Sequence, residues 1–206
     1  MKDHFQTRKK DTLSKQDKSS KQSWDKKIAP LCSKINNLKN YYTTSSCSGR
    51  IILMLDQSKK SHGLFLKVYH DKITFEELKD DLLKLIPPKK QTSNFSLTTS
   101  SKRGVAEPRL IKFKQEPCII HVACTSLPSA QDFYNKARLA GWKKHGIIAS
   151  GKRFVVEATG TDKLEFPIIN KGKILVGDEF LKLVVKKSNE NLEKSWEMIN
   201  RLEESL

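Results

Sequence analysis

The chain has 206 residues, of which 37% are hydrophobic and 30% are charged. This is enough for one medium domain or two small ones with a real core. The 39 lysines and arginines outnumber 23 acidic residues, which gives a formal net charge of +16. Such an excess excludes an acidic, freely solvated tail protein. It favours a polyanionic partner, either a nucleic acid or an anionic membrane surface.

No segment has the pattern of a membrane anchor or a secretory signal. The longest apolar run, from Ile51 to Leu55, is far shorter than the roughly 20 residues that a membrane span requires. The opening MKDHFQTRKK has no apolar segment of the signal-peptide kind. The four cysteines form no CxxC pair, so neither a zinc ribbon nor a redox site is supported, and no metal site is predicted. The sequence therefore predicts a soluble, cytoplasmic protein with reduced cysteines.

Basic charge is concentrated near the N-terminal end. Residues 1–40 hold eleven lysines and arginines but only four acidic residues. Residues 1–23 have little to bury, so the sequence favours a basic N-terminal segment there, with mobility as one interpretation. A single domain is predicted over residues 24–206. Apolar residues at helical spacing predict its first helix, and they are Trp24, Ile28, Leu31, Ile35 and Leu38.

The middle of the chain alternates predicted strands with one helix. Residues 41–50, YYTTSSCSGR, are polar and predict a loop, which leads into a buried strand over residues 51–55. A second strand over residues 64–69 precedes a helix over residues 75–86, which two prolines end. The Ser-, Thr- and Lys-rich stretch at about residues 89–107 predicts a flexible loop, either a mobile linker or a segment that orders over a ligand.

Strands and helices recur in the C-terminal half without a regular βαβ alternation. The expected strands cover residues 109–113, 118–124, 145–150, 153–158, 166–169 and 174–176. The expected helices cover residues 126–141, with Ser126 as N-cap, and a long closing stretch from Phe180 to Leu202. Hairpins mixed with helices predict an α+β fold, a layered α/β sandwich with a mixed β-sheet.

The most unusual local sequence is TTSSCSGR, from Thr43 to Arg50. Six small hydroxyl or thiol side chains precede a glycine and an arginine. They offer short donors, close backbone approach at Gly49 and a planar cation at Arg50, which together suit an anionic or carboxylate-bearing ligand. The alternative interpretation is an ordinary Ser/Thr-rich turn between a helix and a strand.

Two histidines are candidates for proton transfer. His70 follows a predicted strand, and His121 lies inside the apolar run CIIHVAC. An imidazole beside a hydroxyl-rich loop can accept a proton, although a lone histidine in a strand more often makes a structural hydrogen bond. The residues are therefore compatible with an enzyme that uses one of these histidines as a base. They also leave open a non-catalytic basic RNA-binding module and a hydrolase that uses Cys47 with a histidine. None of the motifs GxGxxG, GxxxxGK[ST], GxSxG or HExxH occurs.

Five segments together resemble the tRNA wybutosine-synthesising protein 3 family. They are YTTSSCSGRI, the YH of LFLKVYH, KFKQEPCIIHVAC, the AxLAGWxxxGI pattern and the closing SNENL. The resemblance spans about residues 5–202. It implies a methyltransferase that uses S-adenosylmethionine and has the family's own α/β fold instead of a Rossmann-like one. The implied substrate is phenylalanine-specific tRNA, methylated at N4 of 4-demethylwyosine, a modified guanosine beside the anticodon.

The resemblance also implies roles for the motif residues. The expected cofactor-binding residues are Ser45, Ser46, Ser48 and Gly49. The expected catalytic residues are Arg50, which positions a ligand together with the serines, and His70 and His121, one of which assists proton removal. Tyr69 departs from the family, in which Trp is frequent before the histidine. No metal, covalent intermediate, membrane or obligate protein partner is expected.

Overall fold

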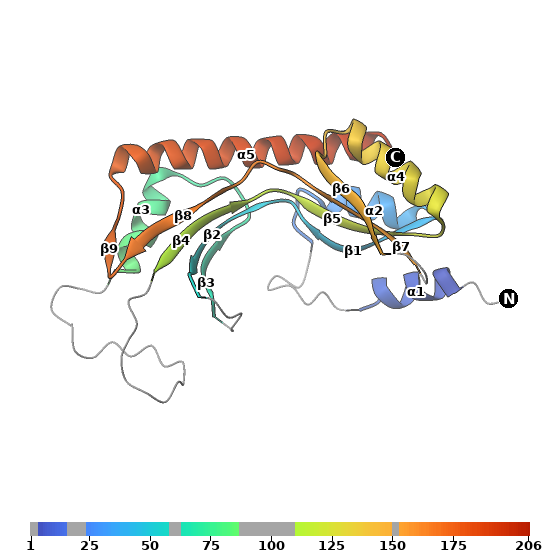
Figure 1. The fold of residues 1–206 in the computed structure, drawn as a ribbon, viewed down its shortest axis with the longest axis horizontal. Coiled ribbons are helices and arrows are strands. Elements are labelled where there is room, and N and C mark those ends of the chain that lie inside the picture. Colours follow the sequence, from blue (N-terminus) through green and yellow to red (C-terminus); the bar gives the residue numbers. More distant parts are fainter. Residues whose placement is uncertain (1–3, 16–23, 58–62, 87–109, 150–152) are drawn as a thin grey trace, which may run out of the picture. The chain divides into compact units, whose positions relative to one another are not determined.

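The structure, a computed structural model, describes residues 4–15, 24–57, 63–86, 110–149 and 153–206. The chain divides into two compact units, each assembled from separate stretches (Figure 1). The first unit contains Met1–Arg50, Glu116–Asp162 and Asn191–Leu206, and the second contains Ile51–Gln115 and Lys163–Glu190. The loop predicted at residues 89–107 lies outside the described residues. The division into an N-terminal segment and a single domain over residues 24–206 stays a prediction.

The first unit contains a four-stranded sheet with strand order β1-β5-β7-β6. Its strands are β1 (Tyr41–Cys47), β5 (Ile119–Cys124), β6 (Lys144–Ala149) and β7 (Phe154–Thr159). All three pairings between neighbours are antiparallel. The strands β6 and β7 confirm the two strands that the sequence predicted over residues 145–150 and 153–158, and they pair directly with each other.

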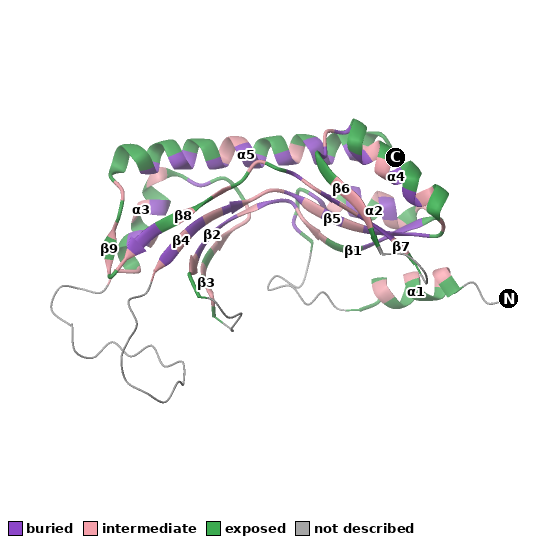
Figure 2. Cartoon of the chain, viewed as in Figure 1, coloured by how far each residue is buried: buried purple, intermediate pink, exposed green. Residues whose placement is uncertain are grey.

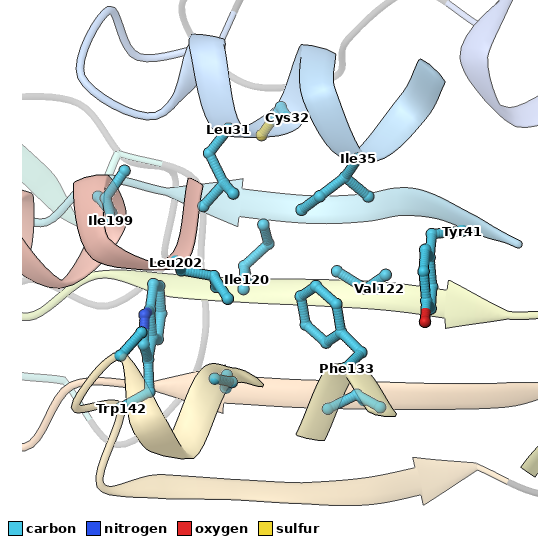
Figure 3. Close-up of a cluster of buried hydrophobic side chains, with 14 of the residues drawn as sticks. Leu31, Cys32, Ile35, Tyr41, Ile120, Val122, Phe133, Trp142, Ile199 and Leu202 are labelled. Atoms are coloured by element: carbon cyan, nitrogen blue, oxygen red, sulfur yellow. The ribbon is translucent and has the colours of Figure 1, made fainter. Parts of the chain in front are cut away.

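Helices cover both faces of this sheet. The helices of the first unit are α1 (His4–Leu13), α2 (Ala29–Asn37), α4 (Leu127–Leu139) and the C-terminal part of α5 (Asp178–Glu204). On one face, buried side chains of α2, α4 and α5 form the core together with Ile120 and Val122 of β5 (Figures 2 and 3). On the other face, Phe5 of α1 packs against Tyr42, Ala123 and Val155. Ile28, Leu31 and Ile35 of the predicted stripe are buried in this core, whereas Trp24 is 40% exposed and lies before the helix, which begins at Ala29.

The second unit contains a five-stranded sheet with strand order β3-β2-β4-β8-β9. Its strands are β2 (Arg50–Leu55), β3 (Phe65–Tyr69), β4 (Ile111–Glu116), β8 (Leu164–Asn170) and β9 (Lys173–Ile174). The helix α3 (Phe75–Lys84) begins with a capping box between Thr74 and Glu77. This arrangement satisfies orphan backbone donors at the helix start. The strands predicted over residues 51–55 and 64–69 and the helix predicted over residues 75–86 are confirmed as β2, β3 and α3.

The α+β class is confirmed, and the sheets are two antiparallel ones where a single mixed sheet was predicted. Successive strands change sheets at short interruptions, such as Pro117 between β4 and β5. Proline cannot donate to a strand ladder, so the pairing breaks there. Antiparallel pairing also distinguishes the fold from a Rossmann fold, in which the sheet is mostly parallel. Among the described residues, none of the helices combines the length and the apolar character needed to cross a membrane.

Residues 41–47 form a strand, so the prediction of a loop there was wrong. Tyr41 and Thr43 are buried, Tyr42 is buried on the opposite face, and Thr44 and Ser45 are exposed. Tyrosine and threonine suit a pleated, half-buried surface despite their polar atoms. The strand β1 lies at the edge of its sheet and has a polar sequence, so it was predicted as a loop. Its hydrophobic contacts come from the rings of Tyr41 and Tyr42 and not from aliphatic side chains.

Candidate active site

The hydroxyl groups of the TTSSCSGR segment lie on two faces of the sheet. Ser46 faces α2, where its Oγ accepts a hydrogen bond from Cys32 Sγ at 3.4 Å. Ser45 is exposed and pairs with His121 across the ladder between β1 and β5. Side chains alternate between faces along a strand. The two serines therefore do not form the single hydroxyl cluster that a loop would have presented.

Ser48 and Gly49 form a buried connection between β1 and β2. The backbone N and the Oγ of Ser48 both donate to Oδ2 of Asp25, at 3.1 Å and 3.3 Å. Gly49 has a φ of +100°, and a Cβ there would lie 3.0 Å from Leu192 Cδ2 and 3.2 Å from the carbonyl oxygen of Glu116. A side chain at that position has a strained backbone conformation, and its close neighbours would have to shift. These contacts favour a structural role for both residues, which hold the backbone just before Arg50.

Replacing Asp25 with alanine should lower the free energy of unfolding by about 1–3 kcal/mol, because it leaves the buried donors of Ser48 without their acceptor. Asp25→Asn should lose less, since its amide oxygen can still accept a hydrogen bond. Urea unfolding of both variants measures the difference. Equal stability of Asp25→Ala and the wild type would show that Asp25 does not hold this connection.

Arg50 begins β2 and forms an ion pair with Glu116 at the end of β4. The Arg50 Nε donates to Glu116 Oε2 at 2.7 Å. The two side chains retain 30% and 28% of their exposure, so the pair is not sealed inside the core. A guanidinium binds carboxylates through a planar fork of donors. Because both side chains are partly exposed, a ligand could contact the guanidinium of Arg50 and the carboxylate of Glu116.

His121 lies in the middle of β5, between Ser45 of β1 and Glu157 of β7 in the strand register. Its Nε2 lies 2.7 Å from Oε2 of Glu157. His121 is 26% exposed and Glu157 is 31% exposed. We call Ser45, His121 and Glu157 the His121 row. With Nε2 engaged by the carboxylate, Nδ1 is the ring nitrogen that can accept a proton from a ligand.

Glu157 is not among the site residues predicted from the sequence. The signal available in the sequence was a lone acidic residue inside the apolar run FVVEA. An acidic side chain at such a position is uncommon in a half-buried strand. Its partner, however, lies 36 residues earlier in the chain, and only the register of β5 with β7 brings the two together.

His70 directly follows β3 and belongs to the second unit, whereas the other six predicted site residues belong to the first. The preceding Tyr69 is half-buried, and its hydroxyl donates to Oδ2 of Asp81 on α3 at 2.7 Å. The tyrosine thus fastens the end of β3 to α3. The structure therefore brings Ser45 and His121 together on neighbouring strands. His70, the other predicted base, lies in the other unit.

The thiol of Cys47 is poorly suited to act as a nucleophile. Burial raises its pKa to about 11, so the thiol form predominates at neutral pH and the nucleophilic thiolate is scarce. The same cause raises the pKa of Cys32 to about 11 and those of Cys118 and Cys124 to about 12. All four cysteines are free. These properties disfavour the hydrolase alternative built on Cys47.

Comparison with known proteins places the chain in a family. An Archaeoglobus fulgidus protein named tRNA(Phe) 7-((3-amino-3-carboxypropyl)-4-demethylwyosine(37)-N(4))-methyltransferase is 35% identical over 182 residues, which cover 87% of this chain and 81% of that protein. A Methanocaldococcus jannaschii protein of the same name is 32% identical over 188 residues, with 87% and 86% covered.

The fold and the family agree with these relatives. The solved structure of the PH1069 protein from Pyrococcus horikoshii superposes with a TM-score of 0.77 and 28% sequence identity, and the match covers 97% of this chain and 92% of that one. The family described as Methyltransferase TYW3 matches residues 7–206, a range that includes every predicted site residue. The chain therefore belongs to the Methyltransferase TYW3 family.

Proposed function

We propose that this methyltransferase transfers a methyl group from S-adenosylmethionine to N4 of a 4-demethylwyosine-type guanosine beside the anticodon of phenylalanine-specific tRNA. The observation that carries the proposal is the family match over residues 7–206. Two relatives that are at least 32% identical bear names that state methylation at N(4) of a 4-demethylwyosine in tRNA(Phe). The excess of positive charge on the chain suits an RNA substrate.

For this reaction the protein must hold the methyl donor and the substrate nitrogen in line, and one proton must be removed from that nitrogen. S-adenosylmethionine, when bound, supplies an electrophilic methyl group on a sulfonium. The substrate nitrogen N4 makes the new bond to carbon with its own electron pair and must lose its hydrogen as a proton. We assign that proton to Nδ1 of His121. Holding the two reactants in line can supply roughly 7–11 kcal/mol of the barrier reduction.

The partly exposed side chains of the first unit fit the amino-acid end of S-adenosylmethionine. Its carboxylate matches the guanidinium of Arg50, and its ammonium matches the carboxylate of Glu116. The exposed hydroxyl of Ser45 adds a donor and an acceptor. Ser48 and Gly49 contribute indirectly, because they fix the backbone that leads to Arg50.

Substituting lysine for Arg50 should weaken binding of S-adenosylhomocysteine by roughly 10–100-fold. An ammonium cannot reproduce the fork of a guanidinium, and a hydrogen bond to a charged group is worth about 1.5–3 kcal/mol. Calorimetric titration of the product into each variant measures the loss. Arg201→Lys is the matched control, since Arg201 lies in the same unit and donates to the carbonyl of Ala140. Near-normal binding by Arg50→Lys would reduce Arg50 to a generic cation.

A transfer assay tests the function itself. The full chain is incubated with methyl-labelled S-adenosylmethionine and with phenylalanine tRNA that carries 4-demethylwyosine. The label should enter this tRNA but not the same tRNA already methylated at N4. Tight tRNA binding without incorporation would instead support the non-catalytic RNA-binding module.

The helix α1 offers a second test, aimed at the RNA. Phe5 anchors α1 on Tyr42 with ring centroids 5.1 Å apart, while Lys10 and Lys15 are exposed. Neutralising either lysine as Lys10→Gln or Lys15→Gln should flatten the slope of log affinity against log salt by about 0.7–0.9, the effect of one phosphate contact. Lys136→Gln on α4, which packs on the opposite face of the sheet from α1, should leave the slope unchanged. An unaltered slope in both variants would exclude α1 and the residues directly after it from the RNA interface.

A further inference from the structure

The carboxylate of Glu157 directly contacts His121, the candidate base. Oε2 of Glu157 lies 2.7 Å from Nε2 of His121. We propose that Glu157 is a positioning residue, which holds the His121 ring in the tautomer and orientation that leave Nδ1 free to take the proton from N4. This inference rests on the proposed function, since it concerns the same site.

The tautomer follows from hydrogen-bond chemistry. A neutral imidazole has one nitrogen that donates and one that accepts, whereas a carboxylate only accepts. The contact therefore requires the hydrogen on Nε2, which leaves the lone pair on Nδ1. The 2.7 Å separation is at the short end expected for a charge-assisted hydrogen bond. The ring is thus held as a base that points Nδ1 away from Glu157.

The surroundings favour a role in binding or catalysis over a role in stability. His121 and Glu157 are 26% and 31% exposed, and ion pairs with this much solvent contribute little to folding. On β6, the residue opposite Glu157 is Gly146. A Cβ at Gly146 would meet no other heavy atom within 4 Å among the described residues. Space is therefore available next to the His121 row on the sheet.

The proton balance of the step is complete. The N4–H bond breaks, its electron pair remains on N4, and the N4–methyl bond forms as the bond between methyl and sulfur breaks. The proton moves to Nδ1, and the resulting imidazolium keeps its Nε2–H donated to Glu157. The positive charge of the ring is then paired with the carboxylate until the proton passes to water.

Variants of Glu157 test this role in the full chain. Glu157→Gln should lower kcat by roughly 10–100-fold, the usual cost of losing a group that orients a functional histidine. The dissociation constant of S-adenosylhomocysteine and the KM for tRNA should stay within about twofold, because Glu157 acts through His121. Glu157→Asp keeps the carboxylate and should recover part of the rate. Glu165→Gln is the matched control, since Glu165 is a strand glutamate whose carboxylate lies 3.6 Å from Lys112 Nζ.

Nitrogen NMR gives a readout that does not depend on activity. In protein labelled with ¹⁵N histidine, the ring signals of His121 are identified by their absence in His121→Gln. The wild-type ring should show the Nε2–H tautomer when neutral, and Glu157→Gln should shift the population toward a mixture, because a carboxamide can donate as well as accept. An unchanged tautomer in Glu157→Gln would overturn the positioning role.

A double variant separates this inference from the proposed function. If Glu157 acts only through His121, Glu157→Gln should cause no further loss of kcat in a His121→Gln background. Multiplicative losses would overturn the inference. Absence of methyl transfer by the wild-type chain would overturn the proposed function and this role with it. Normal transfer by both the wild type and Glu157→Gln would overturn the positioning role alone.

Discussion

Replacing His121 with glutamine should lower kcat for methyl transfer by roughly 10²–10⁴-fold, the range for loss of a general base. A glutamine amide can still donate to Glu157, so the polar contact on the sheet is kept while the basic nitrogen is removed. The dissociation constant of S-adenosylhomocysteine should therefore change little. Single-turnover rates with saturating tRNA, together with calorimetric binding, separate the loss of rate from any loss of affinity.

Substitution of glutamine for His4 and for His70 provides the controls for this experiment. His4 is exposed on α1, and His4→Gln should leave the rate unchanged. His70 follows β3 in the second unit and is the other predicted base. If His70→Gln carries the loss and His121→Gln does not, the base belongs to the second unit. Normal rates in both variants would mean that water is a sufficient proton acceptor.

Gly49→Ala should be among the most destabilising single changes in the chain. The φ of +100° costs a residue with a Cβ about 1–2 kcal/mol. The new Cβ would also lie 3.0 Å from Leu192 Cδ2 and 3.2 Å from a backbone oxygen, and overpacking of this kind typically costs about 1–3 kcal/mol. Equilibrium unfolding in urea measures the total loss.

Gly63 provides a control that separates the two costs. Its φ is +81°, and a Cβ there would meet no heavy atom of the described residues within 4 Å. Gly63→Ala should therefore lose only the conformational part, and the difference between the two variants reports the packing against Leu192. A Gly49→Ala protein that is as stable as Gly63→Ala would contradict the structural role. If that protein also failed to bind S-adenosylhomocysteine, Gly49 would instead be a direct ligand contact.

Local sequence patterns were sufficient for most helices and strands. The apolar spacing of α2, the two prolines after α3 and the Ser126 N-cap of α4 each involve residues within a few positions of one another. Such signals act within one element, so they can be interpreted without knowing its neighbours. The family was likewise evident from short motifs, above all TTSSCSGR and the histidine of CIIHVAC.

The tertiary structure decided what those motifs do. Because β1 is a strand, Ser45 faces His121 and Ser46 faces α2. A loop would have presented both serines together. Asp25 reaches Ser48 across 23 residues, and Glu157 reaches His121 across 36. Contacts at these separations depend on strand register and on helix packing, which are set by many side chains at once. The sequence by itself therefore determined most of the elements, the family and most of the candidate residues. The contact of His121 with Glu157 arises only when distant strands pair.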